Sequence, residues 1–324
     1  MDLADIEPDQ HWGVMAGLAE RAEMTRLWES VWLYDHVHTV PVPSHEATHE
    51  AWSLMAALAA VTSRIRLGQM CTCMAYRNPA HLAKVAATID IISEGRVEMG
   101  IGAGWYEHEW RAYGYGFPSA GERLGMLDEG VQIFRDMWTK GSATLDGKHY
   151  QVDGAICAPR PLQGTTQPGS ARNGIPMWIA GGGERKTLRI AAKYADYTNF
   201  AAGVFEHKSE ILAAHCAHVG RDFAEITRST NIDVVIGETE KDVKDRIAWL
   251  REHYLKAGVS EAIVDKQVAG LSHGAGVGTP EQIAEKLTTL KGLGLGYTIA
   301  YFTEAAYDTS GMHLFENKVI PELR

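Results

Sequence analysis

The sequence lacks the features that mark several large classes of protein. None of its apolar runs approaches the roughly 20 residues that a membrane-spanning helix needs. Only four cysteines occur, and Cys71 and Cys73 would point to the same side of a strand, which suits neither a mutual disulfide nor a redox turn. The net charge of −10 offers no basic patch for nucleic acid. We therefore expect no membrane, nucleic-acid or metal partner.

The first ten residues are acidic and lack the basic and apolar regions of a signal peptide. We therefore expect a cytoplasmic location. Hydrophobic residues make up 45% of the chain and charged residues 22%, which is typical of a soluble globular protein. Because α/β barrels of this size fold as one unit, we expect a single domain over residues 1–324.

Short apolar runs alternate with amphipathic stretches, the pattern of a parallel sheet with crossover helices. This pattern fits either a TIM (β/α)8 barrel or an open doubly wound sheet, and the barrel is preferred mainly for the resemblance described below. Seven strands can be assigned, so the first is short or missing. The expected strands are Ser30–Asp35, Arg66–Cys73, Val97–Gly102, Met177–Gly181, Tyr197–Ala201, Asn231–Gly237 and Tyr297–Phe302. The expected helices are His11–Met24, Trp52–Thr62, Asn78–Ser93, Ala120–Trp138, Glu184–Tyr194, Glu240–Lys256 and Thr279–Leu293.

Two segments break this alternation. Gly141–Asn173 contains an expected hairpin at Leu145–Tyr150 with an Asp-Gly turn, and Gly258–Gly278 is glycine-rich at its end. Insertions that follow barrel strands lie at the catalytic face, so we expect both segments to shape a substrate pocket.

Two glycine-rich turns follow expected strands. Gly181, Gly182 and Gly183 precede a helix, whose free N–H groups and dipole favour an anion such as phosphate, although a tight turn without ligand is the alternative. The turn Gly100–Trp105 has alternate glycines, which leave room either for a flat ring or for close packing inside the barrel.

Polar residues follow two other strands. Asp35 and His36 end the first assigned strand, where they would lie at the mouth of a barrel, and histidine can transfer a proton near neutral pH. Thr72 interrupts the apolar run Gln69–Met74, so its hydroxyl needs a partner from the backbone or a ligand. Arginines such as Arg77 could meet an anionic substrate, but a surface ion pair is the more common role.

Taken in order, these segments resemble the luciferase-like flavin monooxygenase superfamily, and most of all its branch that uses the deazaflavin coenzyme F-420. The resemblance extends from about Trp12 to Leu323. Its motifs are Ser30–His36, Arg66–Gly68 with Tyr76–Pro79, Gly95–Val97 with Gly100–Trp105, Ala180–Leu188 and Phe315–Pro321.

The resemblance implies a barrel that commonly forms a homodimer and binds a flavin-type cofactor. It places Asp35 and His36 beside the ring, with His36 in proton transfer and Asp35 orienting it. A non-prolyl cis peptide is implied near Gln69-Met70. The other implied cofactor contacts are Met70, Thr72, Ala103, Gly104 and His108, with a phosphate cradle at Ala180, Gly181, Gly182 and Gly183.

The chain departs from the sugar-phosphate dehydrogenases of the superfamily at Trp105, which replaces their acidic glutamate, so glucose 6-phosphate is not an expected substrate. The leading prediction is an F-420-dependent oxidoreductase that transfers a hydride to or from a small organic molecule. His108 and Glu109 are weaker acid–base candidates. The alternatives are an FMN-dependent monooxygenase and a non-catalytic flavin-binding protein.

Overall fold

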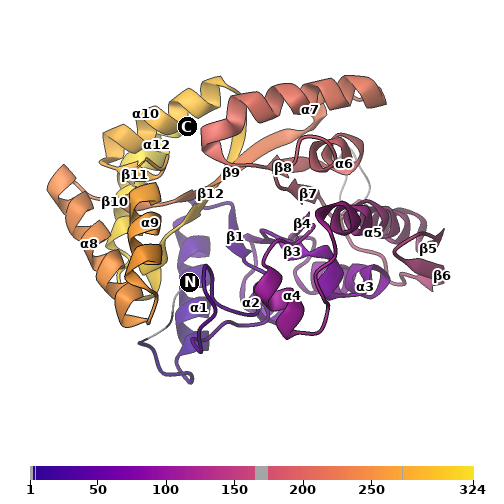
Figure 1. Cartoon of the computed structure of the whole chain (residues 1–324), viewed down its shortest axis with the longest axis horizontal. Helices are drawn as coiled ribbons and strands as arrows, with labels where there is room; N and C mark the ends of the chain where they lie inside the picture. Colours follow the sequence, from indigo (N-terminus) through magenta and orange to yellow (C-terminus); the bar gives the residue numbers. More distant parts are fainter. Residues whose placement is uncertain (1–2, 4, 165–173, 272) are drawn as a thin grey trace.

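Seven parallel strands form a nearly closed barrel in the computed structural model, which describes residues 3, 5–164, 174–271 and 273–324. Neighbouring strands follow one another in chain order, whereas a doubly wound sheet reverses its order at a switch point. The helices lie outside the strands (Figure 1). The barrel prediction is therefore confirmed. The strands are, in order, β1 (Ser30–Leu33), β2 (Arg66–Gln69), β4 (Val97–Gly102), β7 (Met177–Ala180), β8 (Tyr197–Asn199), β9 (Thr227–Asp233) and β12 (Leu295–Tyr301).

The long helices begin where the sequence supplies capping groups. Asn78 caps α3 with Pro79 at its first position, while Ser119, Thr239 and Thr279 each form a capping box. The long helices are α1 (His11–Thr25), α2 (Ala51–Val61), α3 (Pro79–Ile92), α5 (Ala120–Lys140), α6 (Thr187–Tyr194), α7 (Phe205–Val219), α8 (Glu240–Lys256), α9 (Glu261–Leu271) and α10 (Pro280–Gly292). None of the described helices is long and apolar enough to cross a membrane.

Some expected boundaries were wrong. The run Arg66–Cys73 is two strands, β2 and β3 (Thr72–Cys73), because the chain is interrupted at a cis peptide between Met70 and Cys71. Helix α6 begins at Thr187 rather than at residue 184, because residues 184–186 form a turn. The expected strand Asn231–Gly237 also divides, and its second half pairs in a separate small sheet.

The glycines of β4 make room for this interruption. A Cβ atom on Gly100 would lie 1.7 Å from the carbonyl oxygen of Gln69, and one on Gly102 would lie 2.8 Å from Sγ of Cys71. Of the two roles considered for the turn, the structure shows close packing within the barrel at these two positions.

We expect Gly100→Ala to lower the free energy of unfolding by about 3 kcal/mol, the upper end of ordinary overpacking, because backbone atoms must move. Gly17→Ala in α1 is the control, since its Cβ would meet no atom within 4 Å and alanine favours a helix. Urea unfolding measures both variants. Equal stability of the two would contradict this account of the β4 glycines.

The barrel is open between β1 and β12, and no strand of the described residues lies between them. Side chains bridge this gap, which we call the seam. Ser30 and Tyr297 share a hydrogen bond of 2.6 Å, the rings of Tyr34 and Tyr301 lie 5.6 Å apart, and Trp28 packs against Phe302 at 5.9 Å. The prediction of a short or missing first strand agrees with this arrangement, although residues 1, 2 and 4 lie outside the described part.

Aromatic side chains fill the interior of the barrel. Trp178 stacks on Tyr197 at 3.9 Å and meets Trp32 edge-on at 4.6 Å. Below them Glu98 accepts a hydrogen bond from Trp178 and pairs with Arg66. Burial raises the pKa of Glu98 to about 7 despite the nearby arginine. Because these side chains fill the barrel interior, the carboxyl ends of the strands are left as the place where a ligand can bind.

Both insertions have structure of their own. The predicted hairpin is confirmed as β5 (Ser142–Asp146) and β6 (Gln151–Ile156), which lie beyond α5 (Figure 1). Residues 165–173 of the same insertion lie outside the described residues. The chain between β9 and α10 adds α8, α9 and the two-stranded sheet of β10 (Val235–Ile236) and β11 (Val277–Gly278). The insertion Gly258–Gly278 contributes α9 and β11 to it. A single domain over residues 1–324 stays a prediction.

Candidate active site

A cavity of about 1950 Å³ lies at the carboxyl ends of the strands and continues along the seam. Ligand pockets commonly measure about 300–1,000 Å³, so this one can hold a cofactor and a substrate together. Of the residues predicted from the sequence to bind a cofactor, those lining the cavity are Asp35, His36, Met70, Ala103, Gly104, Ala180 and Gly181.

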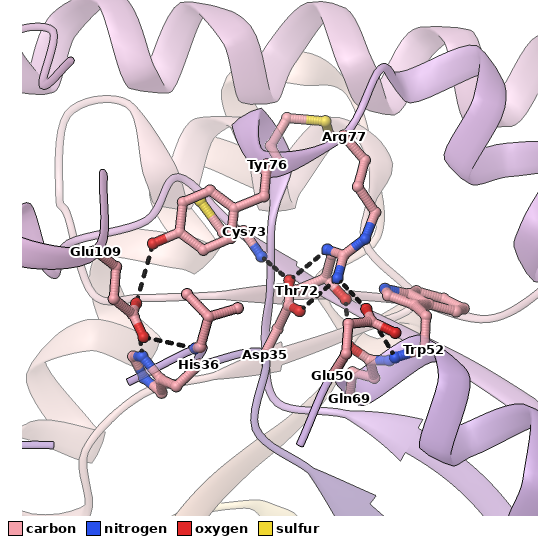
Figure 2. A network of polar contacts seen from close by, with 12 residues as sticks. Asp35, His36, Glu50, Trp52, Gln69, Thr72, Cys73, Tyr76, Arg77 and Glu109 are labelled. Carbon is pink, nitrogen blue, oxygen red and sulfur yellow. Dashed lines mark hydrogen bonds and ion pairs between the residues drawn. The ribbon is translucent and has the colours of Figure 1, made fainter. Parts of the chain in front are cut away.

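His36 is held by a buried carboxylate. Its Nδ1 lies 2.9 Å from Oε2 of Glu109, whose side chain is 1% exposed (Figure 2). Oε1 of the same carboxylate accepts hydrogen bonds from the backbone N–H groups of Val37 and His38, and the hydroxyl of Tyr76 donates to Oε2. Because Nδ1 donates to Glu109, Nε2 is the ring nitrogen left for a ligand in the cavity.

Glu109 is held in its ionised form. Burial by itself would raise the pKa of this carboxyl, but the hydrogen bonds from His36 and from the backbone outweigh burial and hold the pKa below its usual value. Glu109 comes from α4 (Glu107–Ala112), immediately after the glycine turn that follows β4. The carboxylate therefore fixes both the tautomer and the orientation of His36.

Asp35 does not orient His36, contrary to the expectation from the resemblance. Arg77 donates to both of its carboxylate oxygens at 2.8 and 2.9 Å, and the backbone N–H of Cys73 donates to Oδ2 (Figure 2). Arg77 also pairs with the more exposed Glu50. Asp35 thus joins the end of β1 to the segment after β3, and Arg77 is the half-buried structural partner of a buried carboxylate rather than a member of a surface ion pair.

Two other predicted contacts lie away from the cavity surface. Thr72 is fully buried and its hydroxyl donates to Oε1 of Gln69 at 2.9 Å, so its partner is a side chain of the protein. His108 is not among the lining residues, and its ring packs against His38 at 5.0 Å. Among the described residues no group of three or more metal-ligating side chains is found.

The glycine loop at the start of α6 is open to an anion on one side. Gly181 has φ +109°, lines the cavity and would bring a Cβ no closer than 3.5 Å to Thr187. Gly182 and Gly183 lie farther back, where added Cβ atoms would meet Lys208 at 3.3 Å and the Thr187 hydroxyl at 2.6 Å. Thr187 itself lines the cavity at the helix N-terminus.

These features fit a ligand with a phosphate at one end and a flat ring at the other. The loop at Gly181 and the N-terminus of α6 supply backbone donors for the phosphate. Met70, Ala103 and Gly104 line the same cavity as this loop and His36 and form a wall without charged side chains. A flavin-type cofactor has this layout.

Comparison with known proteins agrees with this geometry. A family model described as luciferase-like monooxygenase matches residues 4–296. The chain belongs to this family. Luciferase-like relatives include the pyrimidine monooxygenase RutA of Stutzerimonas stutzeri, 33% identical over 224 residues that cover 66% of this chain and 56% of the relative. Another is the F420-dependent glucose-6-phosphate dehydrogenase of Amycolatopsis mediterranei, 34% identical over 181 residues, 55% of this chain and 48% of the relative.

The match thus spans about half the length of these curated luciferase-like relatives. Two solved structures share the fold across nearly the whole chain. An F420-dependent secondary alcohol dehydrogenase in complex with an F420-acetone adduct has a TM-score of 0.77 at 21% identity, covering 97% of this chain and 96% of that one. Monooxygenase RslO1 from Streptomyces bottropensis has a TM-score of 0.78 at 20% identity, covering 99% and 96%. These two structures show the shared fold, while the family match and the curated relatives support an oxidoreductase of the luciferase-like family.

The sequence pointed to His36 but gave little weight to the residues that hold it. Glu109 was a weaker acid–base candidate, and Tyr76 was known only as part of a motif. The signal that could have found Glu109 is its place just after a strand-end glycine turn, where an acidic side chain faces the barrel mouth.

Proposed function

We propose that the protein is an F-420-dependent oxidoreductase that transfers a hydride between the deazaflavin and a small organic substrate. The observation that carries the proposal is the His36–Glu109 pair at the mouth of a cavity that also reaches a glycine loop suited to an anion. The bound coenzyme would supply hydride chemistry. The homodimer and the cytoplasmic location expected from the sequence stay predictions.

Each residue has a defined part in this proposal. Gly181 and the N-terminus of α6 bind the phosphate, while Met70, Ala103 and Gly104 border the ring. Nε2 of His36 gives or takes the proton that accompanies the hydride, and Glu109 acts through His36 as a positioning residue. Trp105, 63% exposed and 5.9 Å from the His36 ring, borders the substrate side and helps to exclude water.

An FMN-dependent monooxygenase is the second candidate, favoured by the matches to RutA and RslO1. Both cofactors carry a phosphate, a ribityl chain and a ring, so the loop and the wall suit either one. The third possibility, a binding protein without activity, would retain the cofactor but show no redox turnover.

Paired titrations with F-420 and FMN, followed by fluorescence, test the proposal. We expect micromolar binding of F-420 and at least tenfold weaker binding of FMN. The reverse preference would move the protein to the oxygenases, and oxygen consumption with reduced FMN would then be measured. Failure to bind either compound would overturn both functions.

A variant of the glycine loop tests where the phosphate binds. Gly181→Val places a branched side chain at φ +109°, a region that favours glycine, and should raise the Kd of the cofactor about tenfold or more. Gly220→Ala is the matched control, because this glycine caps α7 at φ +70° with open space around it. It should lose a comparable amount of stability and keep its affinity, whereas equal affinities of both variants would place the phosphate elsewhere.

A further inference from the structure

Asp233 is a carboxylate that the proposed reaction leaves unused. It is the last residue of β9, so it lies at the same end of the barrel as His36, and it lines the cavity. Its strand neighbour is Tyr301 on β12, whose ring lies 5.6 Å from Tyr34 across the seam. Tyr34 in turn lies 6.4 Å from the ring of His36. Asp233 and His36 therefore border one chamber with Tyr34 between them.

Among the described residues of the cavity wall, no lysine or arginine pairs with Asp233. The other carboxylates at this end of the strands are committed, Asp35 to Arg77 and Glu109 to His36. Lys286 is the one lysine or arginine among the described lining residues, and it donates to the carbonyl oxygens of Gly274 and Val277. The chamber thus contains a negative charge without a counter-ion of its own.

The charge of Asp233 acts on the nearby side chain of Tyr34. Asp233 is an exposed residue at the end of β9, but the protein around its carboxyl still raises the pKa of that group. Burial, and after it the charge of Asp233, raises the pKa of Tyr34 to about 12. A desolvated carboxylate gains more from a cationic partner than one in bulk water.

A second acceptor lines the same cavity. Oε1 of Gln267 on α9 is buried and has no hydrogen-bond partner among the residues that the structure describes. Leaving a buried acceptor unpaired is costly, so this atom is suited to a donor from a ligand. The aromatic faces of Tyr34 and Tyr301 add the kind of surface on which an ammonium group binds.

We propose that Asp233 is a substrate-recognition residue that selects molecules carrying a protonated amine. The carboxylate accepts the ammonium group and Tyr34 borders it, while the reacting carbon is directed toward the cofactor and His36. This inference deepens the proposed oxidoreductase function and rests on it for the direction of the substrate.

The test compares two probes of nearly equal shape, cyclohexylamine and cyclohexanol, by calorimetry at pH 7.5. We expect the wild-type protein to bind the amine at least tenfold more tightly than the alcohol, and Asp233→Asn to abolish that preference. Asp245→Asn removes the same charge from the exposed surface of α8 and should leave the preference unchanged. Equal binding of the two probes by the wild-type protein, or a preference kept by Asp233→Asn, would overturn the proposal.

F-420 titration of Asp233→Asn separates this inference from the proposed function. An unchanged Kd for F-420 shows that the variant is folded and its cofactor site intact, so that a lost amine preference belongs to Asp233. Wild-type protein that binds F-420 but not the amine would refute the substrate inference alone. Wild-type protein that prefers the amine but binds no deazaflavin would refute the cofactor assignment and keep the amine site.

Discussion

Replacing Glu109 by glutamine should lower turnover about 10²- to 10³-fold while leaving the Kd of the cofactor within a few-fold of wild type. The neutral amide keeps the shape of the side chain but can present either an oxygen or an N–H group to Nδ1 of His36. The tautomer with Nε2 free to accept a proton is then no longer fixed, and general acid–base catalysis commonly contributes 10²–10⁴-fold. Steady-state kinetics with the substrate found by screening measures the loss.

Nitrogen NMR of labelled histidine supplies a reading that does not depend on activity. Wild-type His36 should show Nδ1 protonated in its neutral form, and Glu109→Gln should show a mixture. Tyr76→Phe is the matched control, since it removes one donor to the same carboxylate oxygen and leaves His36 untouched. A single tautomer and undiminished turnover in Glu109→Gln would refute the positioning role.

The same carboxylate should make stability depend on acid pH. The pKa of Glu109 lies below its usual value in the folded protein, so its ionised form stabilises the fold at every pH above the ordinary glutamate range. That contribution is lost as the pH falls through the depressed pKa, below about 4.5. Glu109→Gln should therefore show a smaller loss of stability between pH 5 and pH 3 than the wild-type protein does.

Arg77→Met should lower the free energy of unfolding by about 3–5 kcal/mol, the usual cost of leaving one charge of a buried pair without its partner. Asp35 is 4% exposed, and removal of Arg77 takes away both of its side-chain donors. The methionine retains the length of the stem, so lost packing contributes little. Urea denaturation is the measurement.

Glu50→Gln provides the comparison, because Glu50 pairs with the same arginine from a side chain that is 42% exposed. Exposed pairs contribute up to about 1 kcal/mol, and the amide oxygen of glutamine can still accept a hydrogen bond at the start of α2, which Glu50 caps, so this variant should be nearly as stable as wild type. The double variant Asp35→Leu with Arg77→Met should recover part of the loss, as apolar replacement of buried pairs often does. Equal stability of Arg77→Met and Glu50→Gln would show that burial does not determine how much the Asp35–Arg77 pair contributes to the free energy of unfolding.

Periodicity was sufficient to predict the alternation of strands and helices, because β4 and α8 carry their patterns within their own residues and both have the expected bounds. The choice of a barrel over a doubly wound sheet came mainly from the family resemblance. It failed where a partner distant in sequence decides the structure. The division of the run Arg66–Cys73 depends on β4, whose glycines accept the interrupted chain. Helix α7 went unassigned, since no capping signal precedes Phe205.

In the candidate site, too, residues with a local sequence signal were predicted and residues that depend on distant partners were not. His36 was predicted from its place at a strand end and from a motif. Its partner, however, lies 73 positions later, and no local pattern indicates whether Asp35 or Glu109 will reach the ring. Asp233 has no motif around it at all, and only the packing of β9 beside β12 brings it into the cavity.

The barrel is held together less strongly at the seam between β1 and β12 than at the other positions around its circumference. Every other pair of adjacent strands is joined by a ladder of backbone hydrogen bonds, whereas this pair is joined by a few side-chain contacts such as Ser30 with Tyr297. Opening at the seam breaks fewer bonds than opening anywhere else. Tyr34 and Tyr301 border the reaction chamber and lie on opposite sides of the seam. We therefore expect the chamber to widen most easily by separation of β1 from β12.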